Sequence, residues 1–240
     1  MSNFGPAEFG PAVFGGDPAS SLLLEVDAEV TTIARRFIAR STTDGTAFKT
    51  IEFSLGQGGT DPFDYKTTVP VNPDAQSLEL PISIPMVTLP GTLSTIASDT
   101  TIGTSEDLTT WLRPGYQVEV TTASGIETLV VSTVSSTEFT VTTDATWTDP
   151  IATGTIEPYI TGAKNITEYE HANEHSGTTY CVVTPTEANE ALSEIGIWGT
   201  VLWSPYTAEI GSTFLAAIAH FPLICKNTSM SYALRVNVQF

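Results

Sequence analysis

The chain has 240 residues, enough for one large domain or two small ones, and its 27 acidic and 9 basic residues give a formal net charge of -18. This charge disfavours binding to nucleic acid or to an anionic membrane surface. Ser and Thr are abundant, Lys is scarce, and Gly and Pro recur at short intervals. Because β-branched residues suit a pleated strand better than a helix, the composition predicts an all-β protein of short strands and turns.

Residues 1–19 contain a short repeat, Phe-Gly-Pro-Ala twice and then Phe-Gly-Gly, which places Phe4, Phe9 and Phe14 five residues apart. Pro removes backbone donors and Gly raises the entropic cost of ordering, so the segment is predicted to be an extended arm. It is either a disordered leader or an arm whose aromatic side chains dock in grooves of neighbouring subunits. The segment has no signal-peptide pattern, and no stretch of the chain is long and apolar enough to predict a membrane helix.

Residues 20–90 are predicted to form the first part of a β-sandwich. The run from Ser20 to Thr42 fits both a helical stripe and an alternating strand, and we interpret it as strand. The glycine run Gly56-Gln-Gly-Gly59 is not followed by the Lys-Ser/Thr of a phosphate-binding loop, and Asp61-Pro62 begins another turn. We therefore expect a loop between strands at this point.

Residues 91–161 have a distinct sequence pattern, in which short runs of alternating apolar residues are separated by turn residues. This pattern predicts a small β-barrel inserted into the sandwich. Three aromatic residues of this insert, Trp111, Tyr116 and Trp147, would stack on sugars if the insert bound a glycan. The competing interpretation places them in the barrel core or in contacts between domains.

Residues 162–240 are predicted to complete the sandwich. Residues 195–198 and 201–203 have the pattern of a hairpin pair, and residues 214–221 are expected to be extended because Pro222 follows. The final stretch alternates strictly, with apolar side chains at Tyr232, Leu234, Val236, Val238 and Phe240. Such a strand needs a cover for its apolar face, either from its own chain or from another subunit.

One short motif has a catalytic form, His171-Ala-Asn-Glu174-His175, the inverted zincin pattern. It needs a helix and a further acidic ligand, but Ser176-Gly177 follows at once, so we interpret it as a polar loop and leave metal binding by His171, Glu174 and His175 open. His220 is expected to be a buried, hydrogen-bonded side chain. No enzyme activity and no cofactor are predicted.

The two cysteines, Cys181 and Cys225, lie in apolar runs and are expected to be buried and reduced. A single disulfide between them is the alternative for an oxidising compartment.

Several runs resemble a module found in structural proteins of tailed bacteriophages. In the C-terminal half these are Leu-Ser-Glu-Ile-Gly-Ile-Trp at 192–198, then Phe-Leu-Ala at 214–216, His-Phe-Pro at 220–222 and Lys226 before the final strand. Upstream, Ile-Glu-Phe-Ser-Leu-Gly-Gln-Gly-Gly at 51–59 followed by Asp61-Pro62 resembles the early strand and glycine turn of the same proteins. Residues 114–120 and 131–141 are similar to small β-barrels that decorate virion proteins.

The resemblance implies a structural protein of the virion, in the neck, tail or baseplate, assembled in the host cytoplasm from copies of itself and other virion proteins. The alternatives are a capsid decoration protein and a receptor protein that binds a host glycan through the insert. The side chains expected at subunit contacts are Phe4, Phe9 and Phe14 in the arm, Trp198 and Trp203 in the predicted hairpin, and Val238 and Phe240 in the final strand.

Overall fold

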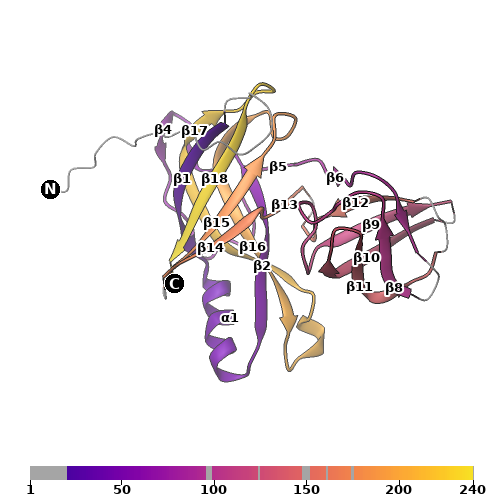
Figure 1. The fold of residues 1–240 in the computed structure, drawn as a ribbon. Coiled ribbons are helices and arrows are strands. Elements are labelled where there is room, and N and C mark those ends of the chain that lie inside the picture. Colours follow the sequence, from indigo (N-terminus) through magenta and orange to yellow (C-terminus); the bar gives the residue numbers. More distant parts are fainter. Residues whose placement is uncertain are drawn as a thin grey trace. The chain divides into compact units, whose positions relative to one another are not determined.

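The computed structural model of the protein describes residues 21–95, 99–123, 125–147, 152–160, 162–173 and 176–239 (Figure 1). Within these ranges the chain has one α-helix and one 3-10 turn, and its other regular elements are β-strands, so the all-β prediction is confirmed. The chain divides into two compact units: the residues up to Ile84 with those from Ile166 onward, and an insert from Pro85 to Asn165.

The larger unit is built on a curled sheet with the order β2-β16-β17-β1-β18-β15-β14. These strands are β1 (Ser21–Val30), β2 (Ala47–Gly56), β14 (Glu168–Asn173), β15 (Ser176–Val183), β16 (Ala191–Trp203), β17 (Thr213–Cys225) and β18 (Ser231–Gln239). β1 runs parallel to β18 from Ser21 to Ala28, and its last two residues pair with β17. The two halves of the sheet are therefore joined through β1 and share one apolar core. The larger unit thus has a single curled sheet in place of the two facing sheets of the predicted sandwich.

Two consecutive residues bring the ends of this sheet together. The amide of Ile166 donates to the carbonyl of Ile51 in β2, and the amide of Thr167 donates to the carbonyl of Tyr180 in β15, each at 2.9 Å. Because β2 and β15 lie toward opposite ends of the strand order, this short segment closes the curled sheet into an incomplete barrel.

The alternation predicted for the final strand is confirmed in the described residues. Leu234, Val236 and Val238 of β18 are buried, and β18 is flanked by β1 on one side and β15 on the other. The cover for its apolar face therefore comes from its own chain. Phe240 and the arm with Phe4, Phe9 and Phe14 lie outside the described residues.

The interpretation of residues 20–42 as strand is right for β1 and wrong for the rest, because α1 (Thr32–Thr43) follows directly. The side chain of Thr31 caps this helix by accepting a hydrogen bond from the amide of Ala34. Phe37 packs the helix onto the sheet, with its ring 4.4 Å from that of Phe214. A buried aromatic contact thus fixes α1 against the start of β17.

The predicted hairpin at residues 195–203 is also wrong, because β16 is one continuous strand. Gly199 lies in the middle of it and makes no turn. A Cβ at this position would lie 2.8 Å from the ring of Phe214, so the glycine allows close packing across β16 and β17. The extended conformation predicted before Pro222 is confirmed by β17.

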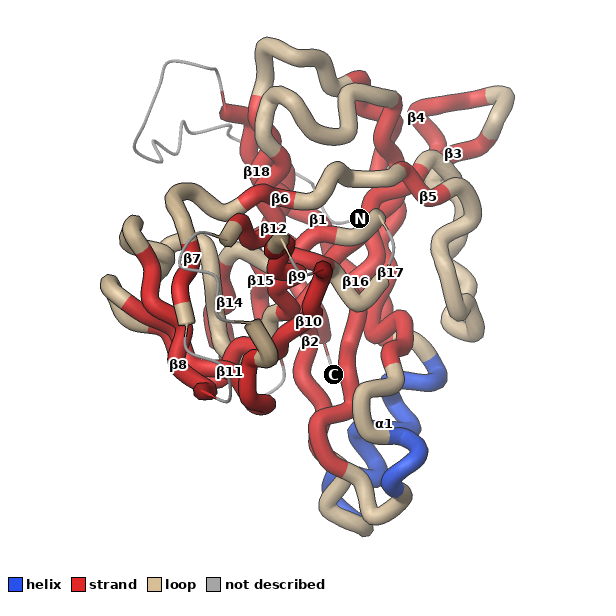
Figure 2. Tube along the Cα trace, turned by 90° about the vertical axis from the view of Figure 1, so that its right-hand side faces the viewer, coloured by secondary structure: helices blue, strands red, loops and turns tan. Residues whose placement is uncertain are grey.

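Three short strands extend this unit: β3 (Thr60–Asp61), β4 (Asp64–Thr68) and β5 (Pro81–Ile82). β5 pairs with the end of β2, while β3 and β4 form a hairpin beside β17 that projects from the sheet (Figure 2). Gln57 to Gly59 connect β2 with β3, so the loop predicted for the glycine run is confirmed.

The insert has its own sheet, in the order β6-β12-β9-β10-β11-β8-β7. Its strands are β6 (Val87–Thr88), β7 (Leu93–Ser94), β8 (Asp99–Thr104), β9 (Gln117–Thr122), β10 (Gly125–Val134), β11 (Glu138–Ala145) and β12 (Thr153–Glu157). The short β13 (Lys164–Asn165) follows in the sequence and is not a member of this sheet. Leu93 and Ala152 exchange two backbone hydrogen bonds, so β7 at one end of the order meets the residue before β12 at the other. The sheet thus curls into a small barrel around a core of its own.

Candidate functional site

The most exposed apolar surface near α1 is the connection between β16 and β17, called here the hairpin tip (residues 202–212). Leu202, Trp203, Tyr206 and Ile210 expose 51%, 50%, 62% and 46% of their surface. The tip carries a single 3-10 turn at Thr207–Glu209 and lies at the same end of the larger unit as α1 (Figure 1). Single exposed apolar residues are ordinary, but four within nine residues mark a surface suited to a partner.

A charged network holds the hairpin tip against α1. Arg40, in the last turn of the helix, contacts Asp44 through Nε and Glu209 through Nη1, both at 2.9 Å. Its guanidinium also lies 5.3 Å from the centre of the Tyr206 ring. Ser204 Oγ donates to the same Glu209 carboxylate at 2.7 Å. The exposed ring of Tyr206 therefore sits on an organised support.

The acidic members of this network stay ionised at neutral pH. Hydrogen bonds from Thr46, assisted by Arg40, hold the pKa of Asp44 below its ordinary value. The hydrogen bond from Ser204, again with Arg40, lowers the pKa of Glu209. The network therefore keeps its charges over the whole physiological pH range.

The structure separates the two tryptophans that were predicted together at subunit contacts. Trp203 lies in the hairpin tip and is half exposed, whereas Trp198 is buried and its indole Nε1 donates to Ser54 Oγ at 2.7 Å. Trp198 therefore acts inside the sheet. Val238 is buried as well, and it lines a cavity.

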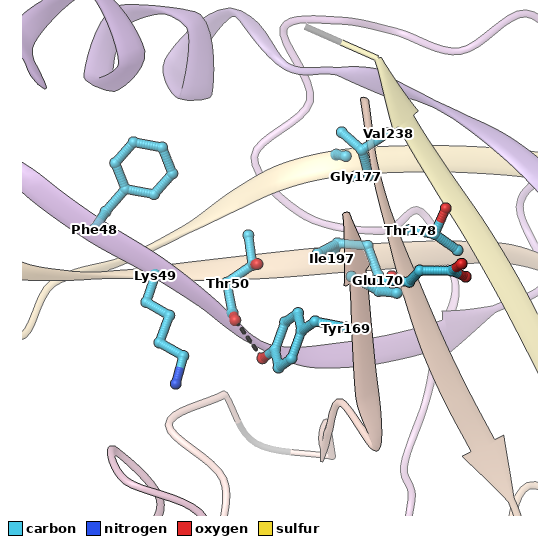
Figure 3. A pocket seen from close by; sticks show the side chains of 11 residues that line it. Phe48, Lys49, Thr50, Tyr169, Glu170, Gly177, Thr178, Ile197 and Val238 are labelled. Atoms are coloured by element: carbon cyan, nitrogen blue, oxygen red, sulfur yellow. Dashed lines mark hydrogen bonds between the residues drawn. The ribbon is translucent and has the colours of Figure 1, made fainter. Parts of the chain in front are cut away.

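This cavity, of about 420 Å³, lies inside the larger unit where β2 and β14 leave the curled sheet open (Figure 3). Its lining comes from β2, β14, β15, β16, β17 and β18 and is mostly apolar. The Tyr169 hydroxyl donates to the carbonyl of Thr50 and so links β14 with β2 at the cavity. The residues that line it are Phe48, Lys49, Thr50, Tyr169, Glu170, Gly177, Thr178, Thr179, Ile197, Ala217 and Val238.

A third feature of the larger unit is the pair of His220 on β17 and Glu194 on β16. His220 Nε2 lies 3.3 Å from Glu194 Oε1, and Nδ1 lies 2.8 Å from the carbonyl oxygen of Val69. Burial alone would lower the pKa of His220, but the hydrogen bonds to Glu194 and to Val69 outweigh it, and the pKa is raised. The prediction of a buried, hydrogen-bonded histidine is confirmed, since its side chain is only 7% exposed.

The glycine run makes room for this pair. A Cβ on Gly56 would lie 2.5 Å from Glu194 Oε2, and the amide of Gly59 donates to Ser193 Oγ at 3.1 Å. These glycines therefore serve close packing over a buried carboxylate.

The zincin-like motif does not form a helix. Residues 171–173 belong to β14, which pairs with β15, while Glu174 and His175 lie outside the described residues. The predicted polar loop is therefore wrong for 171–173, and an extended strand cannot place side chains as the zincin helix does. Within the described ranges no three His, Cys, Asp or Glu side chains gather as a metal site.

The cysteines are both free, which answers the question of a disulfide, but only Cys181 is buried. Cys225, the last residue of β17, is exposed, so the expectation of burial is wrong for it.

The three aromatic residues of the insert, which were interpreted either as core residues or as a glycan-binding set, differ in exposure. Tyr116 and Trp147 are buried in the core of the insert, and Trp111 is 41% exposed.

Neither the cavity nor the exposure of Leu202, Tyr206 and Ile210 was predicted from the sequence. The available signal for the tip was a run of apolar residues around Ser204-Pro205, a turn sequence that brings side chains to the surface.

Comparison with protein families, curated proteins and solved structures found no match to this chain. No helix in the described part of the chain has the length and apolar character needed to cross a bilayer.

Proposed function

We propose that this protein is a structural subunit of the virion of a tailed bacteriophage, where copies of it pack into a homo-oligomeric part of the neck, tail or baseplate. The observation that carries the packing role is the hairpin tip, with Leu202, Trp203, Tyr206 and Ile210 exposed together on a support fixed by Arg40. The virion setting rests on the sequence resemblance described above.

The chemistry of the tip suits a protein contact. Trp, Tyr and Arg are the residues that most often dominate binding energy at interfaces. The tip exposes Trp203 and Tyr206, and the Arg40 guanidinium lies 5.3 Å from the centre of the Tyr206 ring. Arg40 contacts both Glu209 and Tyr206, which reduces the conformational freedom that this part of the tip loses on association. At a formal net charge of -18, copies of the chain repel each other at long range, so association has to come from such apolar contacts.

The glycan-binding alternative has weaker support, since Trp111 is the one of its three aromatic candidates that a sugar can reach. A capsid decoration role would use the same kind of contact and differs in copy number. Counting copies per particle in purified virions by quantitative mass spectrometry separates hundreds of decoration copies from the few of a ring.

Self-association is tested by light scattering of the full chain over a range of concentrations. We expect a multiple of the 25.6 kDa subunit mass, and we expect Trp203→Ser to weaken association about tenfold or more. Trp111→Ser is the matched control, because it removes an exposed tryptophan from the insert, and it should leave association unchanged. A wild-type chain that stays monomeric at about 100 μM, or a Trp203→Ser chain that assembles normally, contradicts the proposal.

A further inference from the structure

We propose that the cavity of the larger unit receives a phenylalanine ring from the Phe-Gly-Pro-Ala arm of a neighbouring copy of the chain. The inference rests on the proposed self-assembly and names the segment and the site that would make the contact.

The cavity fits an uncharged aromatic group. Ile197, Ala217 and Val238 contribute apolar side chains, and the rings of Phe48 and Tyr169 contribute aromatic ones (Figure 3). A dry cavity of about 150 Å³ is enough to bind benzene, so about 420 Å³ holds a phenyl ring together with some of its backbone. Aromatic rings in the lining favour an aromatic guest through edge and offset contacts.

The charged groups of the lining already have interactions of their own. Lys49 Nζ lies 5.8 Å from the centre of the Tyr169 ring, and Glu170 accepts a hydrogen bond from the Tyr180 hydroxyl at 2.8 Å. An incoming ion would have to compete with these contacts, whereas an apolar ring would not.

The arm offers the matching group three times. Phe4, Phe9 and Phe14 are each followed by Gly, which lets the backbone come close to a cavity mouth, and the first two are followed by Gly-Pro. Pro limits the conformations that an extended segment loses on binding, so the entropic cost of docking is reduced.

The direction of β1 is the one that a contact between stacked copies requires. Ser21 pairs with Ser231 at one end of β18, and Ala28 pairs with Val238, which lines the cavity, at the other end. Ser21 and Ala28 are seven residues apart, so at about 3.3 Å per residue these two ends of the pairing lie about 23 Å apart along the strand. The arm therefore joins β1 at the end of this strand that is opposite to the cavity. If copies stack head to tail, the start of β1 in one copy comes near the cavity of the next, and the contact is heterologous.

Gly177 provides a way to fill the cavity without disturbing the fold. It pairs with Val238, it lines the cavity, and a Cβ placed on it meets no heavy atom within 4 Å. Gly177→Phe should therefore place a ring in the cavity, and Gly177→Ala should leave most of the space open. If Gly177→Phe has a melting temperature well below that of the wild type, Gly177→Leu replaces it as the cavity-filling variant.

The binding experiment uses a fluorescein-labelled peptide of residues 4–16, FGPAEFGPAVFGG, and measures fluorescence anisotropy. The receptor is the full chain with Phe4→Ala, Phe9→Ala and Phe14→Ala, whose own arm cannot compete. We expect saturable binding, retention of affinity within about twofold in Gly177→Ala, and a loss of about tenfold or more in Gly177→Phe. A peptide with its three Phe replaced by Ala should not bind. Equal affinity for the Gly177→Ala and Gly177→Phe receptors overturns the proposal.

Failure of the docking and failure of self-assembly give different results. If the wild-type chain oligomerises but the peptide does not bind, the docking proposal is wrong and self-assembly stands. If the peptide binds with the expected dependence on Gly177 while the wild-type chain stays monomeric, the cavity recognises the arm and the proposed self-assembly is wrong.

The competing occupant is Phe240, which follows Val238 by two residues in the sequence. A Phe240→Ala version of the receptor tests it. Binding that occurs only in this version shows that Phe240 fills the cavity and overturns the proposal; binding in both versions supports it.

Discussion

Nε2 of His220 lies 3.3 Å from Oε1 of Glu194, and the Glu194 side chain is completely buried. The pair connects β16 and β17, and the contact of His220 with Val69 extends it to the segment after β4. A histidine inside a sheet that keeps a raised pKa makes the stability of that sheet depend on pH.

The first prediction concerns this dependence. The folded state raises the pKa of His220 above its ordinary 6.5, so the folded state binds the proton more tightly than the unfolded state does. The resulting stabilisation is fully present below pH 6.5 and is lost as the pH rises through the raised pKa. Urea denaturation between about pH 6 and pH 8 should show the decline. His220→Gln should remove this part of the slope, and an unchanged slope in that variant would assign the dependence to other groups.

The second prediction concerns Gly59. A Cβ at this position would lie 1.9 Å from the carbonyl oxygen of Ser193, and backbone atoms cannot give way as a side chain can. Gly59→Ala should lower the free energy of unfolding by about 1–3 kcal/mol or more. Gly177→Ala is the control, because its Cβ has open space, and it should change stability by about 0.5 kcal/mol or less. Denaturation in urea compares the two, and equal effects would contradict the packing described for the glycine run.

The third prediction separates the two tryptophans of β16. Trp198→Phe removes the donor to the buried Ser54 hydroxyl and should cost about 1–3 kcal/mol of folding free energy. Trp203→Phe changes a half-exposed ring and should stay within about 0.5 kcal/mol. Both variants are measured by urea denaturation at a concentration low enough to keep the chain monomeric. The reverse order of effects would show that the buried and exposed positions have been assigned wrongly.

The fourth prediction concerns the start of α1. The Thr31 hydroxyl accepts from the Ala34 amide at 3.2 Å and donates to the Leu215 carbonyl at 2.6 Å, so it joins the helix to β17. Thr31→Ala should destabilise the protein by about 1–2 kcal/mol. Thr31→Ser keeps the hydroxyl and should retain most of the stability. If Ala and Ser behave alike in denaturation experiments, the hydroxyl is not what holds α1 in place.

Sequence patterns predicted an element correctly where the alternation within that element decides which of its side chains are buried. The alternation of Leu234, Val236 and Val238 predicted both a strand and its buried face, and β18 has both. The small barrel was predictable for the same reason, since Val118, Val120, Leu129 and Val131 alternate within short strands and are all buried.

The errors arose where tertiary contacts decide. The run containing Ile33 and Phe37 was ambiguous by periodicity, and the cap at Thr31 was the signal that favours a helix. Gly199 suggested a turn, whereas its role is to admit the Phe214 ring from the next strand. The cavity depends on the curl of the sheet and on six strands at once, so no local pattern indicates it.

The insert has paired ends. Val87, two residues after the start of the insert, pairs with Ile156 of β12. The first and last strands of the insert's sheet in sequence order, β6 and β12, are therefore neighbours in that sheet. A segment with adjacent ends can be gained, lost or exchanged by a single genetic event while the strands before and after it keep their register. The insert is therefore the part of this protein in which related chains are expected to vary most, and it is a natural place to attach a label or a new binding domain.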